Sequence, residues 1–298
     1  MAHLKEVIDR ITSVTSTRQI TKAMKMVAAA KLHKAQQNLY QLHPYAEKLQ
    51  TIVDNTLAST TKKEQKNSYI QTQVTNPNNQ TLIVVIAADR GLCGSFNKNV
   101  FKKTNSYIAT SEANSAHTTP ATLLVIGKKS FQFFSKNKYP LIETYTDLAS
   151  DLSFEKVCQA TQFIMDAFRK GTYDQVVLVH NTFKNAAKQE VSIVPFLPIT
   201  SPEVGTSKEK KLCNTIYEPS QASIIAYLVP DLLQMQLYKA LLCSNAAEHS
   251  ARMTTMSKAT NNANDLLKEL HLTYNRTRQT LITKAISEII GGAEALAG

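Results

Sequence analysis

The distribution of glycine and proline constrains this chain more than any other feature of its sequence. Before Pro77 the only such residue is Pro44, and between Pro230 and Gly291 neither type occurs. Glycine and proline are the strongest local breakers of regular structure, so both ends of the chain can form long helices. The C-terminal helix, from Asp231 to Ile290, would be about 90 Å long at 1.5 Å per residue. No compact domain could contain it.

Both ends also carry apolar residues at three- and four-residue steps, the spacing of an amphipathic helix. Such helices gain most of their stability from packing, so we expect the two to form an antiparallel coiled coil. The C-terminal helix is longer, and its last turns would extend beyond its partner. Ser220 is expected to cap its start, and Pro230 to kink or restart it. The stripes are Leu4, Val7, Ile8, Ile11, Val14, Ile20, Ala23, Met24, Val27 and Ala30, then Leu237, Leu241, Leu266, Leu267, Leu270, Tyr274, Leu281, Ile282, Ile286, Ile289 and Ile290.

Between the ends, short apolar runs of the β type alternate with helical segments. This alternation predicts an α/β domain, Rossmann-like, with a largely parallel sheet. Polar stretches separate the parts, so we expect a helix at 1–58, a base domain at 68–215 and a second helix at 219–298. The predicted strands are 81–88, 121–126, 175–180 and 190–197, and the predicted helices between them are 96–110, 128–135 and 154–169.

Composition narrows the class of protein. An apolar content of 43% can fill a sizeable core, and no stretch approaches the roughly 20 apolar residues of a membrane span. Without a signal-peptide pattern at its start, the chain is expected to stay in the cytoplasm of a bacterial cell. Four widely spaced cysteines predict reduced thiols and no zinc site. The net charge of +11 predicts an acidic partner of some kind.

The turn from Asp89 to Gly94 could carry chemistry, because it follows a strand and leads into a helix. Phosphate often binds at such places in α/β folds. However, neither GxGxxG nor GxxxxGK[ST] is present, so a nucleotide-binding enzyme is only an alternative interpretation. We favour a tight turn with Cys93 packed inside.

Two other features have both a structural and a functional interpretation. His180 ends a predicted strand, with Asp174 and Glu190 nearby in sequence, but no nucleophile motif accompanies it, which favours a structural role over acid–base catalysis.

Residues 1–40 carry seven Lys or Arg against Glu6 and Asp9. No nucleic-acid module accompanies this basic helix, so a protein-facing or solvated surface is the better expectation.

The C-terminal helix changes character along its length. From Ser244 to Asp265 small and polar residues dominate, which predicts a close helix–helix approach, a surface that passes several partners, or both. From Leu281 to Leu296 the helix becomes apolar on several faces, so we expect another protein to enclose this tip.

Several of these segments together resemble the gamma-subunit family of F-type ATP synthases, over essentially the whole chain. They are ITKAMKMVAAAK (20–31), DRGLCGSFN (89–97), EHSARMTTMSKATNNA (248–263), LTYNRTRQ (272–279) and ITKAISEIIGGAEAL (282–296). The resemblance implies a rotating central stalk that is not itself catalytic and holds no cofactor. It also implies that proton flow through a membrane ring of c subunits turns the stalk, so that beta subunits make or hydrolyse ATP.

The resemblance further implies particular partners and contact residues. The coiled coil would stand inside a ring of three alpha and three beta subunits, on the cytoplasmic face of the inner membrane. The base would meet the epsilon subunit and the c ring, so the chain would join the membrane only through the complex. Matching positions on the shaft, expected near an acidic lever loop of beta, are Met24 with neighbouring Lys22 and Lys25, and Arg252, Arg278, Gln279 and Thr283.

The base contacts implied by the resemblance lie in two segments, from His33 to Tyr45 and from Leu212 to Tyr217. The sequence departs from the family pattern at Ala285, where ITxE has Glu, which removes a charged shaft contact. Ser95 after GLCG is a second, milder departure.

Overall fold

The computed structural model describes residues 2–59, 69, 80–114, 121–148, 152–185, 188–199, 217–218 and 220–297. The chain forms two compact units, one of Met1–Ala29 with Arg252–Gly298, and one of Ala30–Ala251. We call them the coiled-coil unit and the sheet unit. Both long helices run through the boundary between the units, and the three-part division by residue range stays a prediction.

The predicted long helices are present at both ends of the chain. Helix α1 spans Ala2–Ser59 and α5 spans Gln221–Ala297. Ser220 caps α5 as predicted, because its Oγ accepts a hydrogen bond from the backbone N–H of Ser223 at 3.3 Å. Helix α5 does not restart at Pro230 but continues through it. Buried apolar residues on both sides of the proline, such as Val229 and Leu233, hold this stretch of helix in place.

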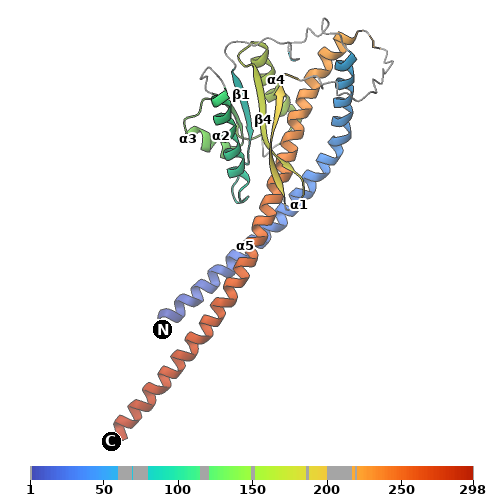
Figure 1. The fold of residues 1–298 in the computed structure, drawn as a ribbon. Helices are drawn as coiled ribbons and strands as arrows, with labels where there is room; N and C mark the ends of the chain where they lie inside the picture. The colour runs from blue at the N-terminus through green and yellow to red at the C-terminus, as the bar shows by residue number, and fades with distance from the viewer. Residues whose placement is uncertain are drawn as a thin grey trace. The chain divides into compact units, whose positions relative to one another are not determined.

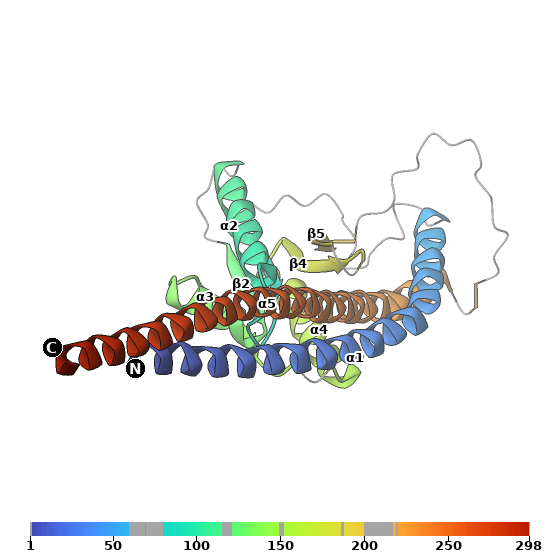
Figure 2. The ribbon, with the colours of Figure 1, turned by 90° about the horizontal axis from the view of Figure 1, so that it is seen from below.

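The two helices run antiparallel within the coiled-coil unit. Thr21 of α1 contacts Thr260 of α5, whereas Arg18, earlier in α1, contacts Asn264, later in α5. Figure 2 shows the two helices side by side in this unit, with the N- and C-termini toward the same end. The predicted antiparallel coiled coil is therefore confirmed.

The sheet unit contains a five-stranded sheet in the order β3-β2-β1-β4-β5. Strands β1 to β4 are parallel to one another, and β5 is antiparallel to β4. The largely parallel sheet is confirmed, but β3 was not predicted. The strands are β1 Thr81–Ile86, β2 Thr122–Ile126, β3 Leu141–Tyr145, β4 Gln175–Phe183 and β5 Gln189–Leu197.

Helices cover both faces of this sheet (Figure 1). On one face α2 (Phe96–Asn114) and α3 (Lys128–Lys136) enclose a core that includes Phe134. On the other face α4 (Phe154–Arg169), α1 and α5 enclose a larger core that includes Leu82. Every residue of β1 is buried, as expected for a central strand that is covered on both faces.

Candidate interaction surfaces

A regular seam joins α1 and α5 in the coiled-coil unit. Buried or half-buried residues recur along both helices at alternating steps of three and four, which is the heptad pattern of a coiled coil. The apolar pattern of the sequence predicts the three- and four-residue steps, but it does not by itself reveal the seven-residue repeat. The inward rows are Val7, Val14, Thr21 and Ala28 with Leu4, Ile11 and Arg18 on α1, and Met256, Ala263 and Leu270 with Met253, Thr260, Leu267 and Tyr274 on α5.

The seam is polar near its middle. The hydroxyl of Thr260 lies 3.0 Å from Oγ1 of Thr21, and Thr21 is 9% exposed. Nη1 of Arg18 donates a hydrogen bond to Oδ1 of Asn264 at 3.5 Å. A polar layer of this kind lowers the stability of a coiled coil relative to an apolar one.

The predicted shaft contacts around Met24 lie on the surface of the coiled-coil unit. Lys22 and Lys25 are exposed, and Met24 and Arg252 are half-buried. Around them, large apolar side chains are exposed to an unusual degree for a helix surface: Ile20 60%, Met26 59% and Val27 57%. Exposed apolar residues beside lysines are typical of a surface that contacts another protein.

The remaining predicted shaft contacts form a separate group. Arg278, Gln279 and Thr283 are all exposed on α5, and the hydroxyl of Thr283 donates to the carbonyl of Gln279 at 3.0 Å. Arg278 is 26 residues from Arg252 along the same helix, which corresponds to about 39 Å. The two groups therefore cannot contact one small loop of a partner at the same time.

The end of α5 carries apolar residues that the described part of the chain leaves exposed. Ile282, Ile286, Ile289 and Ile290 are between 51% and 71% exposed. Ala285, where the family resemblance implied a glutamate, is exposed among them. The expectation that another protein encloses this tip stays a prediction.

The predicted base contacts belong to the sheet unit. His33 and Tyr45 are exposed on α1, with Tyr45 at 53%, and Tyr217 is half-buried just before α5. Leu212 lies outside the described residues. Whether these residues meet an epsilon subunit or a c ring stays a prediction.

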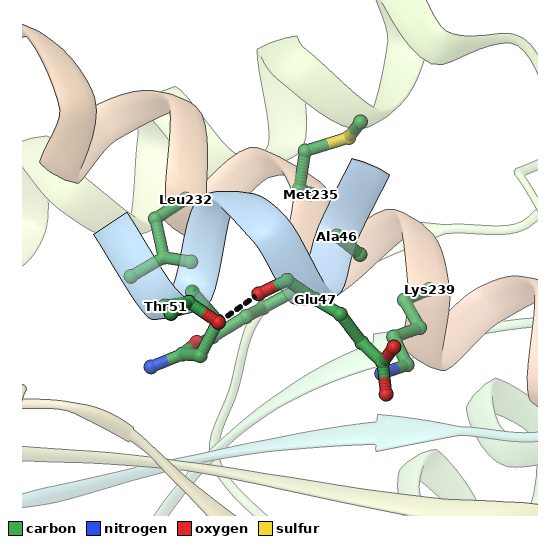
Figure 3. Close-up of a pocket in the computed structure, with 8 residues that line it drawn as sticks. Ala46, Glu47, Thr51, Leu232, Met235 and Lys239 are labelled. Atoms are coloured by element: carbon green, nitrogen blue, oxygen red, sulfur yellow. Dashed lines mark hydrogen bonds between the residues drawn. The ribbon is translucent and has the colours of Figure 1, made fainter. Parts of the chain in front are cut away.

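Next to Tyr45, a groove of about 480 Å³ lies between α1 and α5 of the sheet unit (Figure 3). Nε2 of Gln236 donates to Oε1 of Gln50 across it at 3.1 Å. Leu232 and Met235 give it apolar walls, and Glu47 and Lys239 place one charge of each sign at its rim. Among the described residues that line the groove there is no Ser, Cys or His, so it is a poor candidate for an active site.

The turn from Asp89 to Gly94 buries the side chain of Cys93, while residues 90–92 and Gly94 are exposed. Cys93 is 2% exposed and packs with Ala88, Phe96, Ala247 and Ala251. One carboxylate oxygen of Asp89 accepts the backbone N–H of Lys128 at 2.9 Å, at the start of α3. The favoured interpretation, a turn with Cys93 inside, is therefore confirmed.

The small residues in the middle of α5 explain this packing. Ala247 and Ala251 approach the turn, and Oγ of Ser250 accepts a hydrogen bond from Nε2 of Gln189 at 3.1 Å. Sequence reasoning expected this stretch to approach another helix or to pass partner proteins. The structure gives Ala247 and Ala251 a further role, because their small side chains let α5 pack closely on the turn that follows β1 and on the start of α2.

His180 is a core residue of β4. It is 6% exposed, and burial lowers its pKa from 6.5 to about 4. The neighbouring carboxylates have other contacts, since Glu190 pairs with Lys184 and Asp174 accepts the backbone N–H of Gln80. A neutral imidazole with such a low pKa is a poor general base near neutral pH, so the structural interpretation is favoured.

Within the described ranges, no group of three or more His, Cys, Asp or Glu could hold a metal ion. No described helix is long and apolar enough to cross a membrane. The interaction surfaces on the two helices thus remain the strongest candidates for function.

Comparison with known proteins identifies the family. The ATP synthase family model matches residues 3–296. The ATP synthase gamma chain of Amoebophilus asiaticus is 52% identical over 296 residues, covering 99% of each chain. The chain belongs to the ATP synthase gamma-chain family. A second gamma chain, from Cytophaga hutchinsonii, is 44% identical over 297 residues and also covers 99% of each chain.

Solved structures of ATP synthases share the fold of this gamma-chain family member. The central stalk and c-ring structure from Tetrahymena thermophila mitochondria contains a chain that is 26% identical, with a TM-score of 0.58. The match covers 80% of this chain and 99% of that one. A chain of the Euglena gracilis mitochondrial enzyme, 19% identical with a TM-score of 0.64, covers 99% of this chain and 95% of its own length, and shows the fold alone. Gamma chains are a non-catalytic subunit of the synthase complex.

Proposed function

We propose that this chain is the central rotor shaft of an F-type ATP synthase. Its coiled-coil unit stands inside a ring of alpha and beta subunits, and its sheet unit sits on an epsilon subunit and the membrane c ring. Proton flow through the c ring turns the shaft, and its rotation drives the beta subunits through states of different nucleotide affinity. The complex then lies at the cytoplasmic face of a bacterial inner membrane, and the chain joins the membrane only through it.

One observation supports this proposal beyond family membership. The coiled-coil unit is a pair of helices whose outward side chains include exposed large apolar residues, Ile20, Met26 and Val27, beside exposed lysines. Monomeric soluble proteins seldom leave such residues together on a helix surface, whereas a rod enclosed by other subunits would cover them.

Rotation places a physical requirement on such a rod. It can shift a beta subunit between conformations only if each shaft angle contacts one conformation better than the other. The shaft is therefore expected to present different side chains to its partners on its different sides. Cations at Lys22, Lys25 and Arg252 on one stretch, and Arg278 on another, supply contacts that are attractive, modest and sensitive to salt. Weak contacts suit a part that must move past its partners.

The first test is recovery of the tagged chain from membranes of its own cells, with identification of the proteins that accompany it. We expect alpha, beta, epsilon and c subunits, with ATPase activity in the complex and none in the isolated chain. Recovery of the chain alone, with nucleotide turnover of its own, would contradict the proposal.

The second test addresses the contacts. Met24→Lys and Arg278→Ala are expected to lower ATP-driven proton pumping several-fold while leaving assembly and the unfolding midpoint nearly unchanged. Leu272→Lys, at a position that is 70% exposed and outside the predicted contacts, is the matched control. Normal pumping by complexes that contain either contact variant would exclude that residue as a coupling contact.

A further inference from the structure

Arg18 breaks the heptad pattern of α1. It occupies the same inward row as Leu4 and Ile11, and like them it is half-buried. A leucine in this row would bury apolar surface against α5, whereas a guanidinium must be partly removed from water. The stability of the coiled coil therefore does not explain an arginine at this position. Local violations of a regular pattern of this kind are expected mainly at functional sites.

Arg18 lies at the edge of a hollow of about 410 Å³ in the coiled-coil unit. Both helices contribute side chains to it. The lining residues are Thr15 and Arg18 of α1 and Asn264, Leu267, Lys268 and His271 of α5.

The polar groups of the hollow are held in place by neighbours. Oδ1 of Asn264 accepts from Nη1 of Arg18 at 3.5 Å, and Nζ of Lys268 lies 3.1 Å from a carboxylate oxygen of Asp265. A guanidinium has five N–H groups, and the contact with Asn264 uses one of them. Leu267 is buried and gives the hollow an apolar wall.

These groups suit a carboxylate. The guanidinium of Arg18, the ammonium of Lys268 and the hydroxyl of Thr15 line the hollow, and planar N–H pairs of arginine match the two oxygens of a carboxylate. The apolar wall can cover the methylene groups of a glutamate side chain. A free phosphate is a poorer match, because mid-helix backbone N–H groups are already used and the hollow has no helix N-terminus or backbone nest to hold it.

We propose that this hollow binds an acidic side chain, Asp or Glu, of a subunit that surrounds the coiled-coil unit. The proposal rests on the proposed function, because it requires the rod to be enclosed. It adds Arg18 and Lys268 to the shaft contacts that the family resemblance implied. Enclosure would hold the acidic side chain close to the hollow, so that a weak solvent-exposed contact can still be occupied.

The test compares Arg18→Leu with Arg10→Leu. Both changes remove one positive charge and add the same apolar side chain, but Arg10 is exposed outside the seam. Thermal unfolding of the isolated full-length chains, followed by circular dichroism, measures how the substitution changes the stability of the seam. Titration of each chain with the purified alpha and beta subunits, at low and high salt, measures how it changes the binding affinity.

We expect opposite effects from Arg18→Leu. The unfolding midpoint rises by a few degrees because an apolar side chain replaces the guanidinium on the inward row. Binding to alpha and beta subunits weakens roughly two- to fivefold at low salt and less at high salt. Arg10→Leu is expected to leave both quantities close to those of the natural chain.

Other outcomes overturn the proposal. Unchanged binding of Arg18→Leu would show that the hollow is not a contact, while the proposed function would stand because the chain still joins its ring. A fall in both stability and binding would make Arg18 a structural residue. Failure of the natural chain to bind alpha and beta subunits would instead overturn the proposed function.

The partner residue can be identified by a photoreactive amino acid placed at position 271 of the assembled complex. A cross-link to a segment with Asp or Glu next to the linked atom supports the proposal. A cross-link to a segment without acidic residues, or none in a fully assembled complex, contradicts it.

Discussion

Gly127 connects β2 to α3 with a backbone φ of +100°. A Cβ atom at this position would lie 2.2 Å from the backbone carbonyl oxygen of Ala87. Because that oxygen belongs to the chain just after β1, neither partner can move aside easily. Glycine is therefore required here both by its conformation and by the close approach of two backbone segments.

Gly127→Ala is expected to lower the free energy of unfolding by at least about 2 kcal/mol. Urea denaturation of the isolated chain measures this. Gly91→Ala is the control, because nothing lies within 4 Å of its added Cβ. Equal midpoints for the two variants would show that the loop at Gly127 can relax.

His180 links the stability of the sheet unit to pH. The unfolded chain takes up a proton at this residue near pH 6.5, whereas burial lowers the folded-state pKa to about 4. The free energy of unfolding is therefore not reduced by His180 above pH 6.5, and it falls as the pH drops from 6.5 toward 4. The loss amounts to about 3 kcal/mol at most.

His180→Gln is expected to flatten this part of the pH profile. The measurement is urea denaturation at about pH 7, 6, 5 and 4 for the natural chain and the variant. The same slope in both proteins would mean that another group causes the acid sensitivity.

Individual side-chain environments were predicted from sequence only in part. The packed thiol of Cys93 followed from the turn pattern, because the glycines around it carried no phosphate fingerprint. The role of Arg18 did not follow, since the three- and four-residue steps were traced through apolar residues alone. Extending the strict heptad from Leu4 and Ile11 would have placed Arg18 on the inward row.

At the scale of elements, the strands that were predicted most clearly are those buried along most of their length. Residues 82–86 of β1 and 176–179 of β4 are apolar and buried, because helices cover both faces of the sheet. Strand β3 was missed because it is a short edge strand, Leu141–Tyr145, with Ile142 37% exposed and Glu143 in its centre. Its place depends on pairing with β2, a tertiary contact that local sequence does not encode.

Helix α3 is attached to the sheet through a small aromatic cluster. Phe134 is fully buried, with its ring centroid 5.1 Å from that of Phe133 and 5.5 Å from those of Phe101 and Tyr139. Phe131, on the same helix, is 39% exposed. The face of α3 that includes Phe134 therefore packs against the sheet unit and stabilises it, whereas the face that includes Phe131 contributes little.

Phe134→Ala is expected to destabilise the chain by about 3–5 kcal/mol, because it opens a cavity in this cluster. Phe131→Ala is expected to change stability by less than about 0.5 kcal/mol. Chemical denaturation with fluorescence or circular dichroism distinguishes the two. Similar losses would mean that α3 docks through its whole surface.

For the whole molecule, the prediction of two paired long helices succeeded because uninterrupted helical patterns are the strongest signals that a sequence contains. The boundaries of the two compact units cannot be read from the helical pattern in the same way. Both helices belong to two units at once, and the boundary at Ala29 and Arg252 depends on which residues pack together in space.

The tip of α5 is expected to matter for the complex and not for the fold of the isolated chain. Residues 282–295 are exposed throughout, so removal of residues 285–298 should leave the unfolding midpoint unchanged. Removal of residues 261–298 should lower it, because Leu267 and Leu270 of the seam are lost with that segment. Thermal unfolding of the two truncated chains tests this, and a lower midpoint for the shorter deletion would show that the tip stabilises the fold.

The seven-residue repeat of the seam has a mechanical consequence. An α-helix has about 3.6 residues per turn, so a seam that repeats every seven residues winds the two helices around each other in a left-handed sense. Twisting such a pair about its long axis in one direction tightens the winding and presses the seam together, whereas the opposite twist unwinds it. Near Thr21 and Thr260, where polar side chains replace apolar ones, little hydrophobic contact resists unwinding. The rod is therefore expected to be stiffer against torque of one sign than against torque of the other.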